Sequence, residues 1–358
     1  MAMLEAAARR LPSVLASPDA SIAHAMAQLD VAGTGTLLLA DEGRRLCGLV
    51  TDGDIRRAIL ARVPLEQPCH TVATSRPVAA SPSVTPAEAL HLMDHAHGSF
   101  VNSLPVVRAD GVLVGLLLRK DVVSEEQLPL SAVIMAGGYG TRLLPLTERV
   151  PKPMLPVGDR PLLERTVERL RDAGIRRVAI TTHHLADQIT GHFGDGHAYG
   201  VELEYVAENE PLGTAGALRL VKACDHPLLV INGDILTGVR YDLMLDYHRR
   251  HGAELTVGVR PCDLVLPYGV VECRGAQVMS IREKPRSHFL INAGIYLVEP
   301  SARELIPAGR RFDMTELVGR LLDAGRSVVS FPIIEYWLDI GEPADYEQAH
   351  ADLQRARV

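Results

Sequence analysis

The residues best suited to chemistry lie in one glycine-rich stretch near the middle of the chain. The stretch reads MAGGYGTRLLPLT at 135–147, and PKPM follows at 151–154. Such a loop can bring backbone N–H groups against phosphate oxygens, because glycine has no Cβ to obstruct them. Arg142 and Lys152 add two positive charges. A plain tight turn would explain the glycines but not the arginine and the PKP triplet, so the pattern predicts a polyphosphate site.

Two widespread phosphate-binding motifs do not fit this loop. No Gly-Lys-Ser/Thr closes it, which excludes a P-loop. Leu143 stands where a dinucleotide-binding GxGxxG fingerprint would have its third glycine. The loop therefore belongs to another class of phosphate site.

The pattern GGYGTRL at 137–143, followed by PKP, resembles the signature of the sugar-phosphate nucleotidyltransferase family, of the GDP-mannose pyrophosphorylase type. The resemblance extends over residues 131–350. Members join a nucleoside triphosphate to a sugar 1-phosphate and release pyrophosphate. The resemblance implies that Arg142, Lys152 and Asp234 are catalytic. It also implies nucleotide contacts from the loop residues Ala136, Gly137, Gly138, Gly140 and Thr141.

Two aspartates are candidates for a metal site. Asp234 follows the apolar run 228–232, and ligands of open α/β sheets gather at the carboxyl ends of strands. WLDIG at 337–341 resembles a late motif of the same family, so the resemblance implies that Asp234 and Asp339 bind Mg²⁺. Two carboxylates suffice, because magnesium completes its shell with phosphate oxygens and water. Either aspartate alone could be an ordinary turn or cap residue.

The sugar-binding residues are implied by three further segments. Glu283-Lys284-Pro285 resembles the family's E-K-P, in which the glutamate contacts sugar hydroxyls and the lysine contacts the sugar phosphate. Outside this pattern Lys284 would read as a solvated surface lysine. Segments 268–270 and 292–296 resemble other sugar-facing parts. Mannose, glucose, heptose and glucosamine 1-phosphates all stay open. The implied sugar-phosphate contacts are Gly269, Glu283, Lys284, Asn292 and Ala293.

Residues 208–216, ENEPLGTAG, resemble the family's base-recognition loop. Glu208 falls where thymidylyl- and uridylyltransferases often carry glutamine. Guanine offers two adjacent donors, which a carboxylate accepts in fork geometry. Glu208 therefore favours GTP; the alternative is that Glu208 is simply an exposed acidic residue of the loop. Gly213 and Thr214 are further expected nucleotide contacts, at the start of an expected helix.

The first third of the chain contains an internal repeat. GLVTDGDI at 48–55 and GLLLRKDV at 115–122 each follow an apolar run and a charged turn. The repeats resemble a CBS pair, a module that binds adenine nucleotides in many proteins. Thr51 and Asp54 match its ribose and phosphate contacts. The second repeat keeps Asp121, but Leu118 replaces the hydroxyl. A ligand-free pair that only mediates dimerisation is the alternative.

The arrangement of expected elements predicts the fold. We expect tandem CBS repeats over 1–127 (about 13–66 and 75–127), a linker at 122–130, and a nucleotidyltransferase domain over 128–358. The fold class is α/β: a Rossmann-like, mixed, mostly parallel sheet preceded by an α+β CBS pair. In the second domain we expect strands at 131–136, 177–182, 202–206 and 227–232, helices at 160–173, 184–193, 214–223 and 241–251, a β-rich substrate-side insertion with strands at 254–260, 268–273, 277–282 and 290–298, and a closing helix at 343–355.

Composition excludes several classes of protein. The chain has 358 residues and a formal net charge of −7, which disfavours non-specific nucleic-acid binding. Five cysteines at wide spacings, without CxxC, indicate reduced thiols. No apolar run approaches the ~18 residues of a membrane helix, and residues 1–16 lack a signal peptide's apolar core. We expect a cytoplasmic homo-oligomer with no nucleic-acid or membrane partner.

These features predict an enzyme that transfers a nucleotidyl group from a nucleoside triphosphate, with GTP favoured, to a sugar 1-phosphate. Mg²⁺ is the expected cofactor, and an adenine nucleotide at the CBS pair is a possible regulator. Two alternatives stay open: a catalytically silent sensor homologue, and an interaction scaffold in a sugar-nucleotide pathway.

Overall fold

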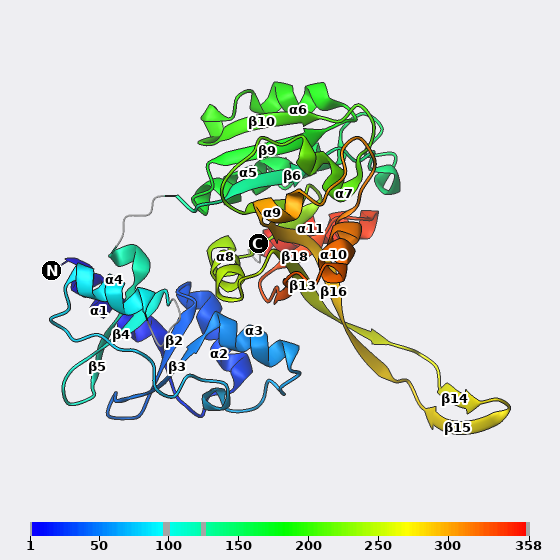
Figure 1. Cartoon of the computed structure of the whole chain (residues 1–358). Helices are drawn as coiled ribbons and strands as arrows, with labels where there is room; N and C mark the ends of the chain where they lie inside the picture. The colour runs from blue at the N-terminus through cyan, green and yellow to red at the C-terminus, as the bar shows by residue number, and fades with distance from the viewer. Residues whose placement is uncertain (1, 96–100, 123–126, 356–358) are drawn as a thin grey trace. The chain divides into compact units, whose positions relative to one another are not determined.

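The computed structural model describes residues 2–95, 101–122 and 127–355. It divides into two compact units (Figure 1). The first comprises Met1–Leu128 with Leu245–His251, and the second comprises Pro129–Met244 with Gly252–Val358. Residues 123–126 of the expected linker lie outside the described residues.

The first unit contains two similar strand pairs. Its elements are α1 (Ala2–Val14), β1 (Leu15–Ala16), α2 (Ile22–Ala32), β2 (Thr36–Ala40), β3 (Leu46–Thr51), α3 (Asp52–Leu60), α4 (Pro86–Asp94), β4 (Ser103–Val107) and β5 (Leu113–Leu118). β2 pairs antiparallel with β3, and β4 with β5. Buried Thr36 and Ser103 share a hydroxyl–hydroxyl hydrogen bond of 2.9 Å between the two repeats. The predicted α+β repeat is therefore confirmed.

One glycine shows how closely this unit packs. A Cβ on Gly115, in β5, would lie 2.8 Å from the backbone carbon of Ala7 in α1. Any side chain at position 115 would therefore push α1 off the sheet. The helix and strand can touch at this point only because residue 115 is glycine.

The second unit is built on a seven-stranded sheet in the order β10-β9-β6-β11-β16-β13-β17. The strands are β6 (Ser131–Met135), β9 (Arg177–Thr182), β10 (Glu202–Ala207), β11 (Leu228–Asn232), β13 (Leu255–Val265), β16 (Arg286–Val298) and β17 (Val328–Pro332). β16 runs antiparallel to both of its neighbours, whereas the other neighbouring pairs are parallel. This confirms the predicted α/β class with a mixed, mostly parallel sheet.

The helices of this unit largely follow the predicted pattern. They are α5 (Leu162–Asp172), α6 (Ala186–Phe193), α7 (Gly213–Gly216), α8 (Tyr241–Arg250), α9 (Pro300–Arg303), α10 (Met314–Asp323) and α11 (Pro343–Gln354); the part of α8 from Leu245 onward is grouped with the first unit. The predicted helix at 214–223 is wrong in extent. α7 has four residues and is followed by a 3₁₀ turn at Ala217–Arg219 instead of further α-helix. At the start of α7 the N–H groups of Ala215 and Gly216 donate to the Phe312 carbonyl. Among the described residues, no helix combines the length and apolar character needed to cross a membrane.

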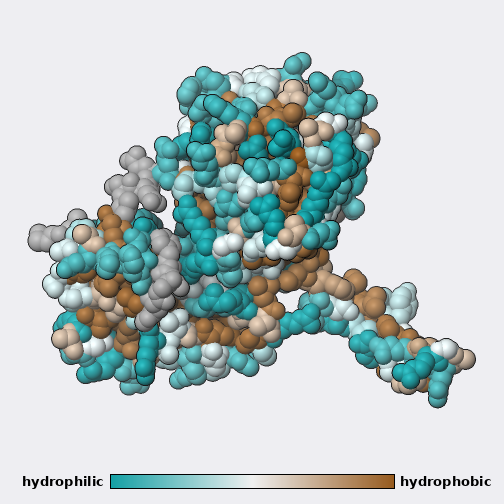
Figure 2. Space-filling model, in the orientation of Figure 1, coloured by the Kyte–Doolittle hydropathy of each residue, from teal (hydrophilic) through white to brown (hydrophobic). Residues whose placement is uncertain are grey.

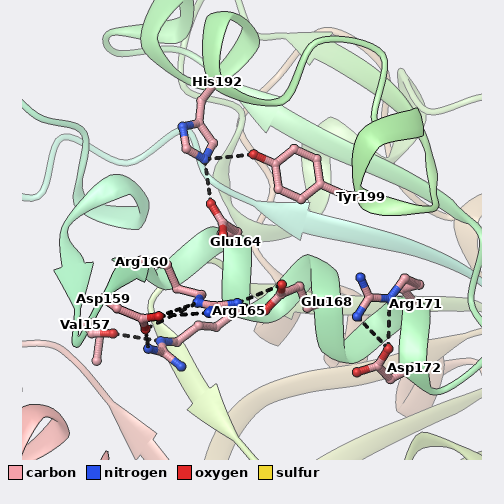
Figure 3. A network of polar contacts seen from close by, with 10 residues as sticks. All are labelled: Val157, Asp159, Arg160, Glu164, Arg165, Glu168, Arg171, Asp172, His192 and Tyr199. Atoms are coloured by element: carbon pink, nitrogen blue, oxygen red, sulfur yellow. Dashed lines mark hydrogen bonds and ion pairs between the residues drawn. The ribbon is translucent and has the colours of Figure 1, made fainter.

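A polar network anchors the exposed side of α5 (Figure 3). Asp159 accepts hydrogen bonds from Arg160 and Arg165, and Arg160 also donates to Glu168. The hydrogen bond from Arg160 lowers the pKa of Asp159 to about 2. His192 of α6 lies 2.7 Å from Glu164 of α5, so the network also joins the two helices. The opposite side of α5 is buried in the core through Leu163, Val167 and Leu170.

The β-rich segment forms an extended arm, defined here as residues 260–291. β13 and β16 continue past the sheet as a two-stranded ribbon, paired from Arg260↔Ile291 to Val265↔Arg286. The ribbon ends in a hairpin of β14 (Val270–Arg274) and β15 (Gln277–Arg282). Figure 1 shows this arm projecting from the body of the second unit. Its strands were predicted, but β13 and β16 are longer than expected.

Candidate active site

The glycine-rich loop and Asp234 meet at one edge of the central sheet. β6 and β11 are parallel neighbours, with Asn232 opposite Met135 at their carboxyl ends. The N–H of Gly233 donates to the Met135 carbonyl at 2.9 Å. A Cβ on Gly233 would lie 2.9 Å from the same oxygen, so this close approach requires glycine. Residues that lie about a hundred positions apart are thereby brought to one place.

Lys152 and Asp234 form an ion pair at this edge. The Lys152 Nζ donates to the Asp234 Oδ2 at 2.5 Å, and both side chains are mostly buried. Gly140, at φ +65°, lies directly beside the lysine stem, since a Cβ there would be 3.0 Å from Lys152 Cβ. The loop glycine therefore leaves room for the lysine to reach the carboxylate.

Asp339 lies next to Asp234 through a second strand pair. β12 (Ile235–Thr237) pairs antiparallel with β18 (Trp337–Asp339), which places Asp339 opposite Ile235. Burial raises the pKa of Asp339, and the negative charge of Asp234 raises it further. The positive charges of Lys152 and Arg142 act in the opposite direction. The two carboxylates and two cations therefore interact electrostatically as one cluster.

Arg142 completes this cluster from the glycine-rich loop. A Cβ on Gly341, two residues after Asp339, would lie 3.3 Å from an Arg142 guanidinium nitrogen. The side chain of Arg142 is exposed, which leaves its donors accessible to a ligand. The structure thus brings together all four residues for which the sequence predicts chemistry: Arg142, Lys152, Asp234 and Asp339.

The two carboxylates fit a divalent cation. The buried Oδ1 of Asp339 has no hydrogen-bond partner among the described residues, which is costly unless a ligand satisfies it. Carboxylate oxygens are the ligands that hard cations such as Mg²⁺ prefer. The described residues hold no cluster of three or more His, Cys, Asp or Glu side chains suited to a metal. Such an ion would therefore need phosphate oxygens or water to complete its shell.

In the glycine-rich loop, Gly138 faces open space, whereas Gly137 lies against the side chain of Glu208. A Cβ on Gly138 would have no heavy atom within 4 Å, whereas one on Gly137 would lie 2.9 Å from the Glu208 Oε1. The other carboxylate oxygen, Oε2, accepts the Leu212 N–H at 2.8 Å. Glu208 is only 8% exposed, so the interpretation of an exposed loop acid is wrong. Ala136 and Thr141 flank these glycines at the end of β6 and the start of a 3₁₀ turn.

His183 is a residue of this site that the sequence analysis missed. Its Nε2 lies 2.8 Å from the Tyr139 hydroxyl, and its Nδ1 lies 2.7 Å from the Glu208 carbonyl oxygen. His183 therefore links the glycine-rich loop to the loop at 208–216. Its position directly after the predicted strand at 177–182 was the available signal.

Gly213 and Thr214 are held by the start of α10. The Thr214 N–H donates to Asp313 Oδ1 at 2.9 Å, and the Thr214 hydroxyl accepts the Met314 N–H at 2.9 Å. A Cβ on Gly213, at φ +79°, would lie 2.5 Å from the same carboxylate oxygen. These contacts fix the end of the 208–216 loop. The sequence analysis missed α10, although its capping box and its apolar spacing at Met314, Leu317 and Leu321 were both readable.

The expected sugar-side residues fall into two groups. Asn292 and Ala293 lie on β16, in contact with the strand that ends in Asp339: the Trp337 Nε1 of β18 donates to the Ala293 carbonyl at 2.9 Å, and the Asn292 amide donates to the Tyr296 hydroxyl at 2.6 Å. The second group lies on the arm, where the structure does not bring it to the carboxylates (Figure 1). It comprises Gly269, Glu283 and Lys284, all exposed.

The candidate ligand residues of the repeats are engaged in local contacts. The Thr51 hydroxyl accepts the Asp54 N–H, and Asp54 accepts the Thr51 N–H, forming the capping box of α3. Asp54 also pairs with Arg57. In the second repeat Arg10 binds Asp121 through two hydrogen bonds of 2.8 and 3.0 Å. Asp121 is therefore already neutralised from within the chain.

Comparison with known families matches both parts of the chain. Residues 131–356 match the family described as nucleotidyl transferase, and residues 8–61 and 69–127 match the CBS domain. A mannose-1-phosphate guanylyltransferase of Mycobacterium tuberculosis is 36% identical over 234 residues, which cover 63% of this chain and 65% of that protein. A UTP–glucose-1-phosphate uridylyltransferase of Synechocystis is 33% identical over 241 residues, which cover 62% of each. The chain thus spans less than two thirds of the length of these relatives.

The fold also matches solved structures. A Bacillus anthracis protein, provisionally named a glucose-1-phosphate thymidylyltransferase and crystallised with sucrose, superposes with a TM-score of 0.51 at 26% identity. The match covers 62% of this chain and 94% of that one. The relatives thus carry names that refer to three different bases, although they share one fold.

Proposed function

The chain belongs to the nucleotidyl transferase family, and we propose that it joins a nucleoside triphosphate to a sugar 1-phosphate with release of pyrophosphate. The observation that carries this proposal is the ion pair of Lys152 and Asp234 beside Asp339 and Arg142, next to a glycine-rich loop. We assign this activity to a domain over 128–358, preceded by CBS repeats over 1–127. Neither a silent sensor nor a scaffold would require two cations and two partly buried carboxylates at one place, whereas phosphate transfer does.

The proposed reaction needs alignment and charge neutralisation more than proton transfer. An oxygen of the sugar phosphate attacks the α-phosphorus in line, and pyrophosphate leaves. The nucleophile is already anionic, so no general base is needed. Arg142 holds the departing phosphates, and Lys152 stabilises the charge that builds on the α-phosphate. A divalent ion, for which we propose Mg²⁺, would be held by Asp234 and Asp339 and would offset phosphate charge.

We propose GTP as the preferred triphosphate because Glu208 is placed against the phosphate loop. One of its oxygens accepts the Leu212 N–H, and the other lies beside Gly137. A carboxylate keeps further acceptor sites when one is used, so it can still take two adjacent donors from guanine. Uracil and thymine offer one donor between two acceptors, which suits an amide better.

An assay of pyrophosphate release should show which nucleoside triphosphate the protein prefers. Four nucleoside triphosphates would be tested against mannose, glucose, heptose and glucosamine 1-phosphates. We expect turnover to be highest with GTP. Glu208→Gln should lower kcat/KM for GTP about 10- to 100-fold, which is the cost of losing a charge-assisted hydrogen bond, and should favour UTP instead. Glu210→Gln, an exposed neighbour in the same loop, is the control and should behave like the wild type.

Equal rates with all four triphosphates, or an unchanged preference in Glu208→Gln, would refute the assignment of the base to Glu208. An absence of pyrophosphate release with every pair would refute the activity and favour the sensor or scaffold interpretation.

We further propose that the first CBS repeat binds an adenine nucleotide through Thr51 and Asp54. In the second repeat the Asp121 carboxylate is already paired with Arg10, and Leu118 has no hydroxyl to offer a ribose. Titration calorimetry of the full chain with AMP, ADP and ATP should show binding that Thr51→Val weakens at least ~10-fold, since the proposed hydrogen bond from the hydroxyl to the nucleotide is lost. Thr85→Val is the matched control: it removes the equivalent capping-box hydroxyl of α4, at a similar stability cost of ~1 kcal/mol, and should keep the binding. No heat with any of the three nucleotides would contradict the proposal.

A further inference from the structure

The arm exposes an unusual amount of apolar surface. Of the seventeen large hydrophobic residues exposed in the described chain, eleven lie between 264 and 291, so this surface is concentrated in a single segment. Tyr268, Ile281 and Phe289 are 75%, 66% and 53% exposed. Figure 2 shows hydrophobic surface along the arm. Isolated apolar residues on a surface are ordinary, but a concentration of this kind marks an interaction site.

The hairpin at the end of the arm has one apolar face and one polar face. Val271 and Ile281 are register partners, so their side chains share a face. The neighbouring positions hold polar residues of the opposite face: Glu272 accepts hydrogen bonds from Ser280 at 2.9 Å and Arg282 at 2.8 Å. The polar face is therefore satisfied within the hairpin, whereas the apolar face is uncovered. A two-stranded hairpin is marginally stable alone in water, so this one needs a surface to cover it.

The size of this surface suits an association between two folded chains. With about 200 Å² for a fully exposed large side chain, the exposed parts of the eleven residues amount to on the order of 1,000 Å². A stable interface of standard size takes about 800 Å² from each partner. The arm alone thus offers enough surface for one half of a dimer contact.

The charges of the arm favour a protein partner. Asp263 pairs with His288 at 2.6 Å and with Arg286 at 3.8 Å, and Glu272 pairs with Arg282. The arm holds five Arg or Lys residues and three Asp or Glu residues, a formal charge of only +2 (5 − 3), which is short of the strong positive field that nucleic acids or anionic lipids require. The chain as a whole carries a net charge of −7, so the rest of a second copy would attract the positively charged arm, and a two-fold pair would cover both arms at once.

The arm also carries residues that the active site lacks. Glu283 and Lys284 are expected to contact the sugar phosphate, yet both are exposed on the arm, whereas Lys152, Asp234 and Asp339 lie at the sheet edge. Lys284 has φ +43°, which is uncommon for a residue with a side chain and often accompanies a functional task. Within one copy, the cation for the sugar phosphate is therefore away from the site that would use it.

We propose that two copies of the chain exchange arms, so that each arm packs on the partner copy and supplies Glu283 and Lys284 to the partner's active site. The proposal rests on the nucleotidyl transfer proposed above and on the sugar-phosphate contacts that the family resemblance implies for Glu283 and Lys284. Each site is then shared: one copy provides Lys152, Asp234 and Asp339, and the other provides the sugar-side lysine.

Mixed dimers provide the decisive test. Lys152→Ala and Lys284→Ala chains would be co-expressed with different tags, and the heterodimer would be purified through both tags. Each homodimer should lose at least ~10²-fold in turnover, because one preorganised charge is missing from both of its sites. The heterodimer should recover about half of the wild-type activity, since one of its two sites combines an intact core with an intact arm.

A heterodimer as inactive as the homodimers would show that the arm serves its own chain and would overturn the exchange. Failure to recover any heterodimer would overturn the docking itself. If the wild type releases no pyrophosphate, the proposed function fails, and the docking is then decided by the next measurement.

Hydrogen–deuterium exchange reports on the docking without any need for activity. Amides of 270–282 should exchange slowly in the wild type, and their protection should fall on dilution, as it must for contact between copies. Ile281→Asp should make the same amides exchange at least ~10-fold faster. Leu322→Asp, which changes an exposed leucine of α10, is the control and should leave them protected. Fast exchange of this segment in the concentrated wild type would contradict the proposal.

Discussion

Lys152→Ala is expected to lower kcat about 10²- to 10³-fold, the usual consequence of removing one preorganised charge from a transition state. The reason lies in the geometry: the ammonium is 2.5 Å from Asp234, mostly buried, and next to Asp339. Without it, only Arg142 and the proposed divalent ion would offset the negative charge that develops beside the two carboxylates. Single-turnover measurement of product formation, at saturating substrates, separates this loss from weaker binding.

The control for this variant is Lys222→Ala, which removes an exposed lysine of the same unit. Lys222→Ala should keep wild-type turnover, and circular dichroism should show both variants folded. Wild-type turnover in Lys152→Ala would contradict the assignment of this cluster as the active site.

Phe312→Ala is expected to destabilise the second unit by about 3–5 kcal/mol, the usual cost of deleting a buried aromatic side chain. Phe312 is fully buried, and the guanidinium groups of Arg310 and Arg320 lie 5.2 and 4.8 Å from its ring centre. Its carbonyl also accepts the N–H groups of Ala215 and Gly216, so the cavity would loosen the 208–216 loop. Urea unfolding, followed separately for each cooperative transition, measures the loss.

Leu322→Ala is the matched control, because Leu322 is a large apolar residue of the same region that is 57% exposed. Its effect should stay within about 0.5 kcal/mol. A similarly small effect for Phe312→Ala would show that this part of the core does not support the loop.

The local pattern of the sequence was sufficient for the parts of the site that depend on short spacings. The glycine-rich loop, Asp234 at the end of β11 and the repeats around Thr51 were all readable, because strand periodicity and the permissiveness of glycine act within a few residues. The same local signals failed at 214–223. There α7 ends at Gly216 and a 3₁₀ turn follows, and the first turn of α7 is held by the Phe312 carbonyl, nearly one hundred residues away in the chain, which accepts the N–H groups of Ala215 and Gly216.

Sequence therefore determined the types of reactive residue and the strand ends that carry them. Only the tertiary structure decided which of them meet. The pairing of β12 with β18 places Asp339 beside Asp234. The buried carboxylate of Glu208 lies against Gly137. The long ribbon of β13 and β16 holds Lys284 away from the two aspartates. Contacts of this kind depend on strand register and on what each surface buries, and these are settled by the packing of distant segments rather than by neighbours in the chain.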